Sequence, residues 1–167
     1  MALNFDKMTE KAQESIAAAQ AFAVERGNPE VDPLHLLSAL LQDDEGLISP
    51  MLSSIGTDRT RLDTMLAADL DRLPRAEGGS TPGANGELQR VFTASTKQAD
   101  AMRDEYVSTE HLLLALAKVD SKAKNVLKLN AVTDADLLKV LQIVRGSARV
   151  TDQTPEGKFQ TLERYGI

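Results

Sequence analysis

Residues 31–42 read VDPLHLLSALLQ, and residues 107–118 read VSTEHLLLALAK. Six of the twelve positions are identical: Val31/Val107, His35/His111, Leu36/Leu112, Leu37/Leu113, Ala39/Ala115 and Leu40/Leu116. The similarity continues outward, because residues 20–24 (QAFAV) correspond to 98–102 (QADAM) and residues 62–66 to 137–141. Two copies of one pattern, with their parts in the same order, predict a duplicated domain with pseudo-twofold symmetry.

Both copies show the periodicity of amphipathic helices. Apolar residues recur every three or four positions in one stripe at 5–23 and in another at 88–102. N-caps are predicted at Thr9, Asp32, Asp58, Ser108 and Thr133, and helix ends at Gly27 and Gly56. No segment alternates β-branched or aromatic residues over a useful length, so no strand is predicted. We therefore predict an all-α fold, a pseudo-twofold duplication of a four-helix unit with about eight helices.

The composition places boundaries between these units. Residues 74–87 (PRAEGGSTPGANGE) contain four glycines and two prolines, which predicts an exposed, flexible linker. The first repeat is then 1–73 and the second 88–145. Residues 146–157 are again poor in apolar side chains, whereas 158–167 regain an amphipathic pattern. We expect 146–167 to be a linker towards a further module outside this chain.

Charge and residue usage exclude several classes of function. The 167-residue chain has a net charge of −6, a sequence pI near 5.0 and no cysteine. An acidic surface releases no counterions from nucleic acid, so nucleic acid is not an expected partner. Without cysteine there are no disulfides, thiolate metal sites or cysteine nucleophiles. No apolar run approaches the roughly 18 residues that cross a bilayer, and no signal peptide is recognisable, so we predict a cytoplasmic protein with no membrane partner.

Catalytic motifs are also missing from the sequence. It contains no GxxxxGK[ST] nucleotide cradle, no HExxH metal pair and no GxSxG nucleophile turn. The two histidines occupy the same place in each copy and are interpreted as capping or packing residues. We predict no catalytic residue, no metal ligand and no cofactor in this chain, and hence no enzyme activity of its own.

The duplicated V-x-x-x-H-L-L-x-A-L pattern, which follows a capped helix and a charged turn, resembles the Clp amino-terminal repeat. Over about residues 5–145 the chain looks like the N-terminal domain of the Clp family of AAA+ unfoldases. The tail VRGSARVTDQTPEGKFQTLERYG and the long linker after Arg72-Leu73-Pro74 resemble the disaggregases of that family. The resemblance implies a chaperone domain of the stress response that captures unfolded or aggregated polypeptide for an absent hexameric AAA+ ATPase. That ATPase would use ATP and magnesium, with a co-chaperone system acting through other domains.

The same resemblance implies a substrate-binding surface made of an apolar groove and nearby polar residues. The groove would lie over Phe92, with Tyr106 and His111 at its edge, although the family has a leucine-like residue at the place of His111. The polar residues that match are Thr9, Asp104 and Glu110. Structural interpretations stay open beside this one. Thr9 can be an N-cap only, Asp104 a helix end, Glu110 a partner of a helix dipole and Phe92 a core residue.

A second function is compatible with the pattern. The chain could instead be an adaptor-docking domain of a ClpC- or ClpA-like unfoldase that partners a protease, binding specific folded proteins. The tail and the long central linker favour the disaggregase interpretation. The isolated domain is expected to be monomeric.

Overall fold

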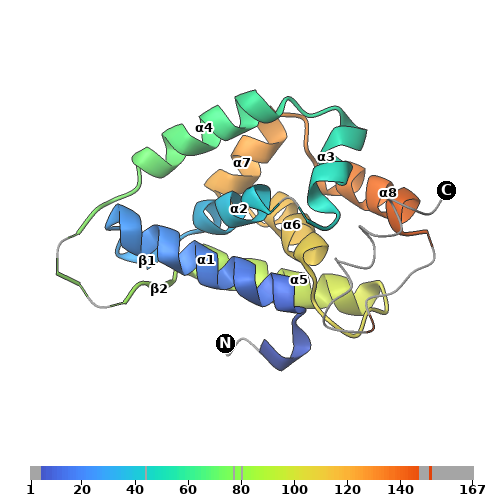
Figure 1. Cartoon of the computed structure of the whole chain (residues 1–167), viewed down its shortest axis with the longest axis horizontal. Helices are drawn as coiled ribbons and strands as arrows, with labels where there is room; N and C mark the ends of the chain where they lie inside the picture. Colours follow the sequence, from blue (N-terminus) through green and yellow to red (C-terminus); the bar gives the residue numbers. More distant parts are fainter. Residues whose placement is uncertain (1–4, 44, 77, 80, 147–150, 152–167) are drawn as a thin grey trace.

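A computed structural model describes residues 5–43, 45–76, 78–79, 81–146 and 151. Within them a 3₁₀ turn, η1 (Phe5–Lys7), precedes eight α-helices, which are coloured along the chain in Figure 1. The helices are α1 (Glu10–Arg26), α2 (Pro33–Gln42), α3 (Ile48–Ile55), α4 (Arg59–Asp71), α5 (Gly86–Ala101), α6 (Thr109–Lys118), α7 (Lys122–Leu129) and α8 (Asp134–Arg145). The predicted all-α fold with about eight helices is confirmed.

The N-caps and the helix-ending glycines that the sequence predicts are confirmed. Side-chain oxygens of Thr9, Asp58 and Thr133 accept backbone N–H groups of the first turns of α1, α4 and α8. Asp32 and Ser108 stand at the N-cap positions of α2 and α6. Gly27 and Gly56 end α1 and α3 in the left-handed conformation, which glycine adopts without a steric cost.

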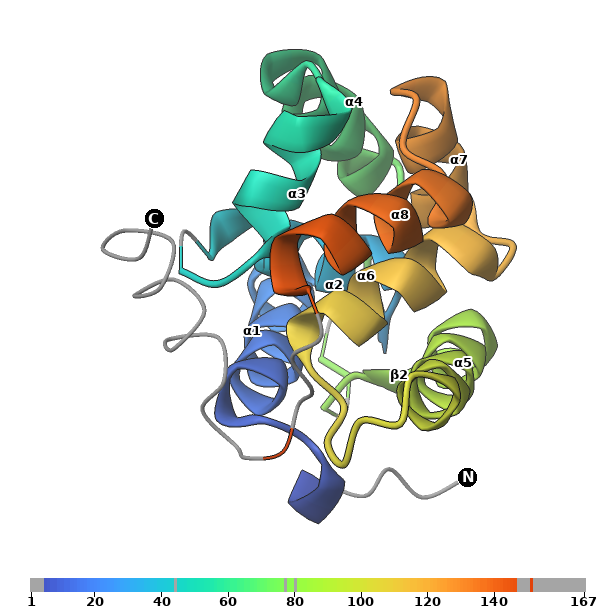
Figure 2. The same cartoon turned by 90° about the vertical axis from the view of Figure 1, so that its right-hand side faces the viewer.

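The two four-helix halves interlock. Within each half the first helix packs on the second, α1 on α2 and α5 on α6. The later helices cross over, because α3 packs against α8 and α4 against α7, and α2 meets α6 at the centre of the molecule (Figures 1 and 2). Each half buries apolar helix faces against the other half, and in a single half these faces would be exposed to water. The two halves therefore form one core.

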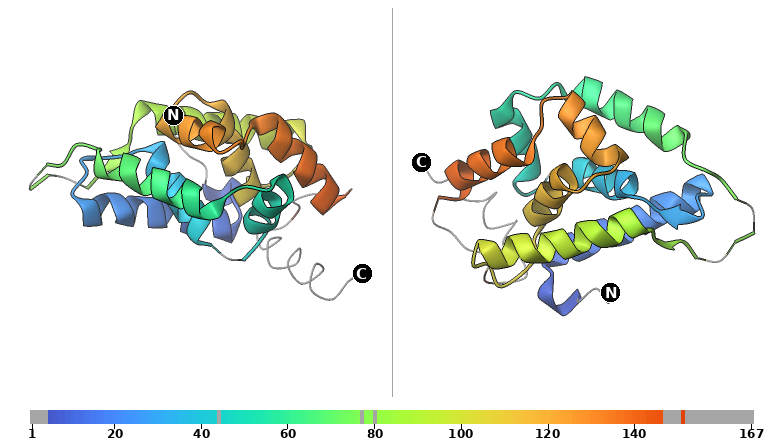
Figure 3. Two further views of the ribbon diagram at one scale, coloured as in Figure 1. Left: turned by 90° about the horizontal axis from the view of Figure 1, so that it is seen from above. Right: turned by 180° about the vertical axis from the view of Figure 1, so that it is seen from behind.

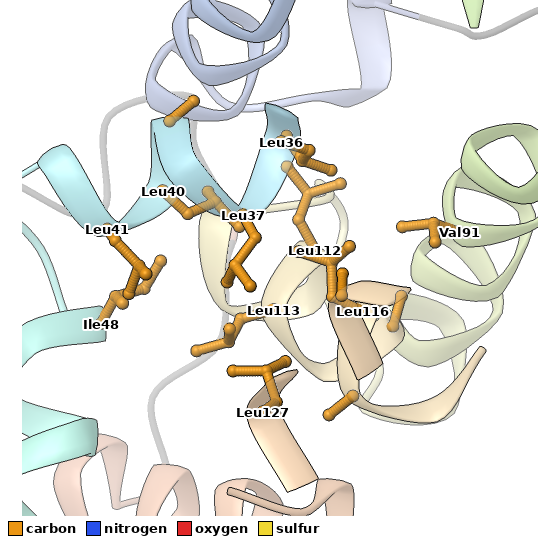
Figure 4. Packing of buried hydrophobic residues seen from close by; sticks show 14 of the residues in the cluster. Leu36, Leu37, Leu40, Leu41, Ile48, Val91, Leu112, Leu113, Leu116 and Leu127 are labelled. Atoms are coloured by element: carbon orange, nitrogen blue, oxygen red, sulfur yellow. The ribbon is translucent and has the colours of Figure 1, made fainter. Parts of the chain in front are cut away.

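Leucines of the duplicated motif fill this core. Figure 4 shows the side chains of α2 facing those of α6 at close range. Six of these residues have no exposed surface: Leu36, Leu37, Leu40, Leu112, Leu113 and Leu116. Burial of such a side chain contributes about 1.5–3 kcal/mol, so the motif that predicts the duplication also supplies the centre of the fold.

The prediction of no strands is wrong at one place. Strands β1 (Glu30–Val31) and β2 (Gly83–Ala84) pair in parallel, and an isolated bridge joins Met8 to Val107. Two-residue strands are too short to show alternation in a sequence. Each pairing joins the two halves. The segment before α2 pairs with the segment before α5, and the segment before α6 pairs with the segment before α1.

The segment 74–87, predicted to be an exposed linker, is attached to the first half at two of its described residues, Pro74 and Pro82. Asn28 Nδ2 donates to Pro74 O at 2.9 Å, and Gln20 Nε2 donates to Pro82 O at 3.0 Å. Pro82 is buried, so the expectation of full exposure is wrong there. Helix α5 already begins at Gly86, within the predicted linker, and Figure 3 shows it from behind along the lower edge of the molecule. Nearly all of the predicted linker 146–167 lies outside the described residues.

Candidate functional site

An apolar pocket of about 140 Å³ lies between α1 and α5. Figure 2 shows these two helices on either side of β2. Its lining comes from both halves and from the segment between them: Ile16, Ala19, Gln20, Val31, Leu36, Pro82, Gly83, Ala84, Leu88 and Phe92. Gln20 is the single polar side chain in this lining, and its amide nitrogen already donates to Pro82 O. The pocket therefore suits an apolar guest.

Phe92 is half-buried and lines this pocket, as the predicted groove requires. Ile16 of α1 also lines the pocket and occupies the equivalent place in the first repeat, seven residues after the N-cap Thr9 as Phe92 is after Asn85. Counted from these N-caps, residues 20–24 correspond to 96–100, so the match of 20–24 with 98–102 expected from the sequence is wrong by two residues. Tyr106 and His111 are not among the lining residues, so the structure does not bring them to the edge of this pocket.

Four predicted polypeptide-binding residues lie inside the protein. Thr9, Glu110 and His111 have no exposed surface, and Asp104 is 7% exposed. Tyr106 is half-buried. A direct contact between polypeptide and any of the four would require that side chain to become exposed first.

Two of the four, Thr9 and Glu110, have roles at the starts of helices. Thr9 Oγ1 accepts the N–H of Ala12 at 3.1 Å, and the Thr9 N–H donates to Val107 O at 3.0 Å. Glu110 lies in the first turn of α6, where the positive end of the helix dipole favours a carboxylate. Thr109 Oγ1 donates to Glu110 Oε1 at 3.3 Å.

Asp104 is the centre of a buried polar network. Its Oδ1 lies 2.6 Å from a guanidinium nitrogen of Arg145, and its Oδ2 lies 2.7 Å from His111 Nε2. The N–H of Ser108 donates to His111 Nδ1 at 2.8 Å, so this nitrogen is an acceptor and Nε2 carries the proton donated to Asp104. One carboxylate thus joins the α5–α6 loop to the first turn of α6 and to the last residue of α8.

The first repeat contains a neutral version of this network. Asn28 Oδ1 lies 2.8 Å from His35 Nε2, and the Asp32 N–H donates to His35 Nδ1, which again places the proton on Nε2. Asn28 Nδ2 binds Pro74 O instead of a charged side chain. Burial is the main cause that lowers the pKa of His35, since removal from water penalises the charged ring.

Sequence reasoning missed Arg145 and Ile16. Arg145 is buried at the end of the stripe Leu137, Leu141 and Arg145, whose spacing of four was the signal that it faces inward. Ile16 was assigned to the core stripe of α1, and its equivalence to Phe92 through the repeat was the signal for a second wall of the pocket.

Other chemistry is not visible in the described part of the chain. No three His, Asp or Glu side chains there are grouped so that they could hold a metal ion. None of the described helices has the length and apolar character needed to cross a membrane.

The Clp repeat N-terminal domain family matches residues 7–130, and the chain belongs to this family. Among curated relatives, it is 46% identical over its whole length to the chaperone protein ClpB of Rhodopirellula baltica. It is 40% identical over 99% of its length to the ClpB of Propionibacterium freudenreichii. The chain spans about a fifth of each of these relatives, 19% of their length.

Solved structures show the same fold. The N-terminal domain of Hsp104 from Candida albicans superposes with a TM-score of 0.81 at 20% identity, covering 90% of this chain and 99% of that one. A ClpV N-domain in complex with a VipB peptide gives a TM-score of 0.69 at 16% identity, covering 88% of this chain and 92% of that one.

Proposed function

We propose that this domain recognises substrate for an ATP-dependent protein disaggregase. It would bind apolar side chains of unfolded or aggregated polypeptide in the pocket between Ile16 and Phe92, and pass the polypeptide to an AAA+ ring. The single observation that carries the proposal is this open apolar pocket in a chain whose ClpB relatives are chaperones. The ClpV N-domain that binds a VipB peptide supports binding of polypeptide by this fold.

The size of the pocket predicts weak binding at each domain. A volume of 140 Å³ holds about one apolar side chain, whose burial is worth about 1.5–3 kcal/mol. A millimolar dissociation constant corresponds to about 4 kcal/mol, so one domain needs several such contacts to hold a chain. Six copies on a hexameric ring would raise the effective concentration and make weak sites sufficient. A weak site with few polar contacts also binds many different sequences, which suits a domain that recognises unfolded chains.

The remaining parts of the machine would lie outside this chain. Its sequence has no phosphate-binding loop, so ATP and magnesium would act in the ATPase module to which residues 146–167 would lead. We propose a cytoplasmic location, a co-chaperone system that acts through other domains, and no nucleic acid partner for this acidic domain.

The test is a titration of the isotope-labelled 167-residue chain with a permanently unfolded polypeptide, followed by backbone amide NMR. Shifts should gather around Ile16, Ala84 and Phe92. Phe92→Ala should weaken binding at least about fivefold, because loss of about 1 kcal/mol changes an equilibrium by that factor. Ile143→Ala is the matched control, since Ile143 is 75% exposed on α8, is not a lining residue, and should leave binding unchanged.

Two outcomes would contradict the proposal. Unchanged binding by a folded Phe92→Ala variant would exclude this pocket as the site. Absence of binding to unfolded chains, together with saturable binding of one folded protein, would establish adaptor docking instead.

A further inference from the structure

Asp104 and Asn28 occupy equivalent places in the two repeats. Each accepts a hydrogen bond from the Nε2 of a histidine seven residues further along the chain. Each also follows a residue with a left-handed backbone, which is Arg103 before Asp104 and Gly27 before Asn28. The two places differ in charge. Asp104 is a carboxylate bound to Arg145, whereas the equivalent of Arg145 in α4 is the buried Leu70, counted from the N-caps Asp58 and Thr133.

The loop that Asp104 holds is connected to both walls of the apolar pocket. It leaves the end of α5, the helix of Phe92. Three residues after Asp104, Val107 binds the segment before α1: its N–H donates to Lys7 O at 2.8 Å, and its carbonyl accepts from Thr9. Helix α1 carries Ile16, the opposite wall. The separation of α1 and α5 is therefore fixed at this end through the α5–α6 loop.

The first repeat fixes the other end in the same way. Asn85 N–H donates to Val31 O at 3.0 Å, which joins the start of α5 to the segment that follows α1. There the histidine and its partner Asn28 are neutral, and a different carboxylate strengthens the link, because Asn85 Nδ2 donates to Asp32 Oδ1 at 2.9 Å. The acceptor of the histidine Nε2 proton is thus an amide oxygen in the first repeat and a carboxylate in the second.

From these contacts we infer that Asp104 is a positioning residue for polypeptide binding, which fixes the α5–α6 loop through His111 and Arg145 and does not touch the polypeptide. This inference rests on the proposed function and assigns Asp104 a role within it. Side-chain exposures of 0% for Asp104 and 3% for Arg145 leave no surface for a substrate contact. Both groups are charged in a dry site, so each needs the other.

The first repeat supplies the test. Asp104→Asn copies Asn28, and Arg145→Leu copies Leu70, so the double variant gives the second repeat the neutral arrangement of the first. Each single change removes one charge of the buried Asp104–Arg145 ion pair and keeps the other, which is strongly destabilising, whereas replacing both members of such a pair is often neutral. The affinity of the 167-residue chain for a permanently unfolded polypeptide is measured for all four proteins, with thermal unfolding to confirm that each is folded.

Each single variant should weaken binding about tenfold, and the double variant should return to within about threefold of the native chain. A double variant that binds as weakly as Asp104→Asn would overturn the inference, because the carboxylate itself would then be needed by the polypeptide. Unchanged binding by both folded single variants would overturn it as well.

A second measurement needs no substitution. When the native chain is saturated with polypeptide, the Asp104 carboxyl carbon and the His111 ring nitrogens should keep their NMR shifts while the amides around Phe92 move. Movement of the Asp104 carboxyl carbon as large as that at Phe92 would show direct contact and refute the positioning role. Absence of any shift at Phe92 would contradict the proposed function itself. This outcome differs from the two above, in which Phe92 shifts and the Asp104 carboxyl carbon either stays or moves.

Discussion

Substitution of Arg103 by glycine should stabilise the protein. Arg103 has a φ of 59°, in the left-handed region, and its counterpart in the first repeat is Gly27 with a φ of 70°. A side chain in this conformation costs about 1–2 kcal/mol, because Cβ approaches the following carbonyl oxygen. Glycine loses about 0.5–1 kcal/mol more backbone entropy on folding than alanine does. The difference predicts a gain of about 0.5–1 kcal/mol in the free energy of unfolding.

Arg103→Ala separates the backbone effect from the loss of an exposed charge, because alanine keeps the unfavourable φ. The free energy of unfolding from chemical denaturation at pH 7 should be higher for Arg103→Gly than for Arg103→Ala and the native chain. Thermal unfolding should show a Tm about 2 °C higher for Arg103→Gly than for the native chain. In the opposite direction, Gly27→Ala should cost about 1 kcal/mol through φ alone, since an added Cβ would meet only Ala76 O, at 4.0 Å. Equal stability of Arg103→Gly and Arg103→Ala would refute this reasoning.

Further predictions concern pH, capping and the core. The pKa of His35 is lowered in the folded state, so its contribution to stability is complete above about pH 6.5 and is lost as the pH falls towards the lower folded pKa. Unfolding free energies of the native chain and His35→Asn between pH 8 and 5 should diverge by at most about 1.4 kcal/mol per pH unit, and parallel curves would contradict this. Thr9→Ala should cost about 1 kcal/mol in denaturation midpoints, and Thr9→Ser should recover most of it. Leu113→Ala should cost about 2–5 kcal/mol because Leu113 is fully buried, whereas Leu129→Ala, at a side chain 59% exposed, should cost under about 0.5 kcal/mol.

The sequence predicted the helices because helical period and capping chemistry are local. The stripe through Ile16 and the oxygen of Thr9 act within one helix, and they determine where α1 starts and which side it buries. The interlocking of α3 with α8 is not local. Periodicity identifies a face that must be covered, but several helices of similar hydrophobicity can cover it.

The candidate site could be predicted less completely. Phe92 was identified because it matched an apolar groove position of the family that the repeat resembles. Burial of Asp104 depends on Arg145, 41 residues further along the chain, and no local pattern records that pairing. Glu110 was expected at a binding surface through the family resemblance, but it is buried in the first turn of α6, where the helix dipole favours its carboxylate.

The crossed packing of the two halves has a consequence for how this domain can vary. Its arrangement is that of an isologous dimer, in which the same surface is used twice, with the two subunits joined into one polypeptide. In a dimer of identical subunits, every substitution would be made on both sides of the axis at once. Fusion removes that constraint, and one member of an equivalent pair can change alone. Asparagine at 28 with aspartate at 104, and isoleucine at 16 with phenylalanine at 92, are therefore asymmetries that only a single chain can hold.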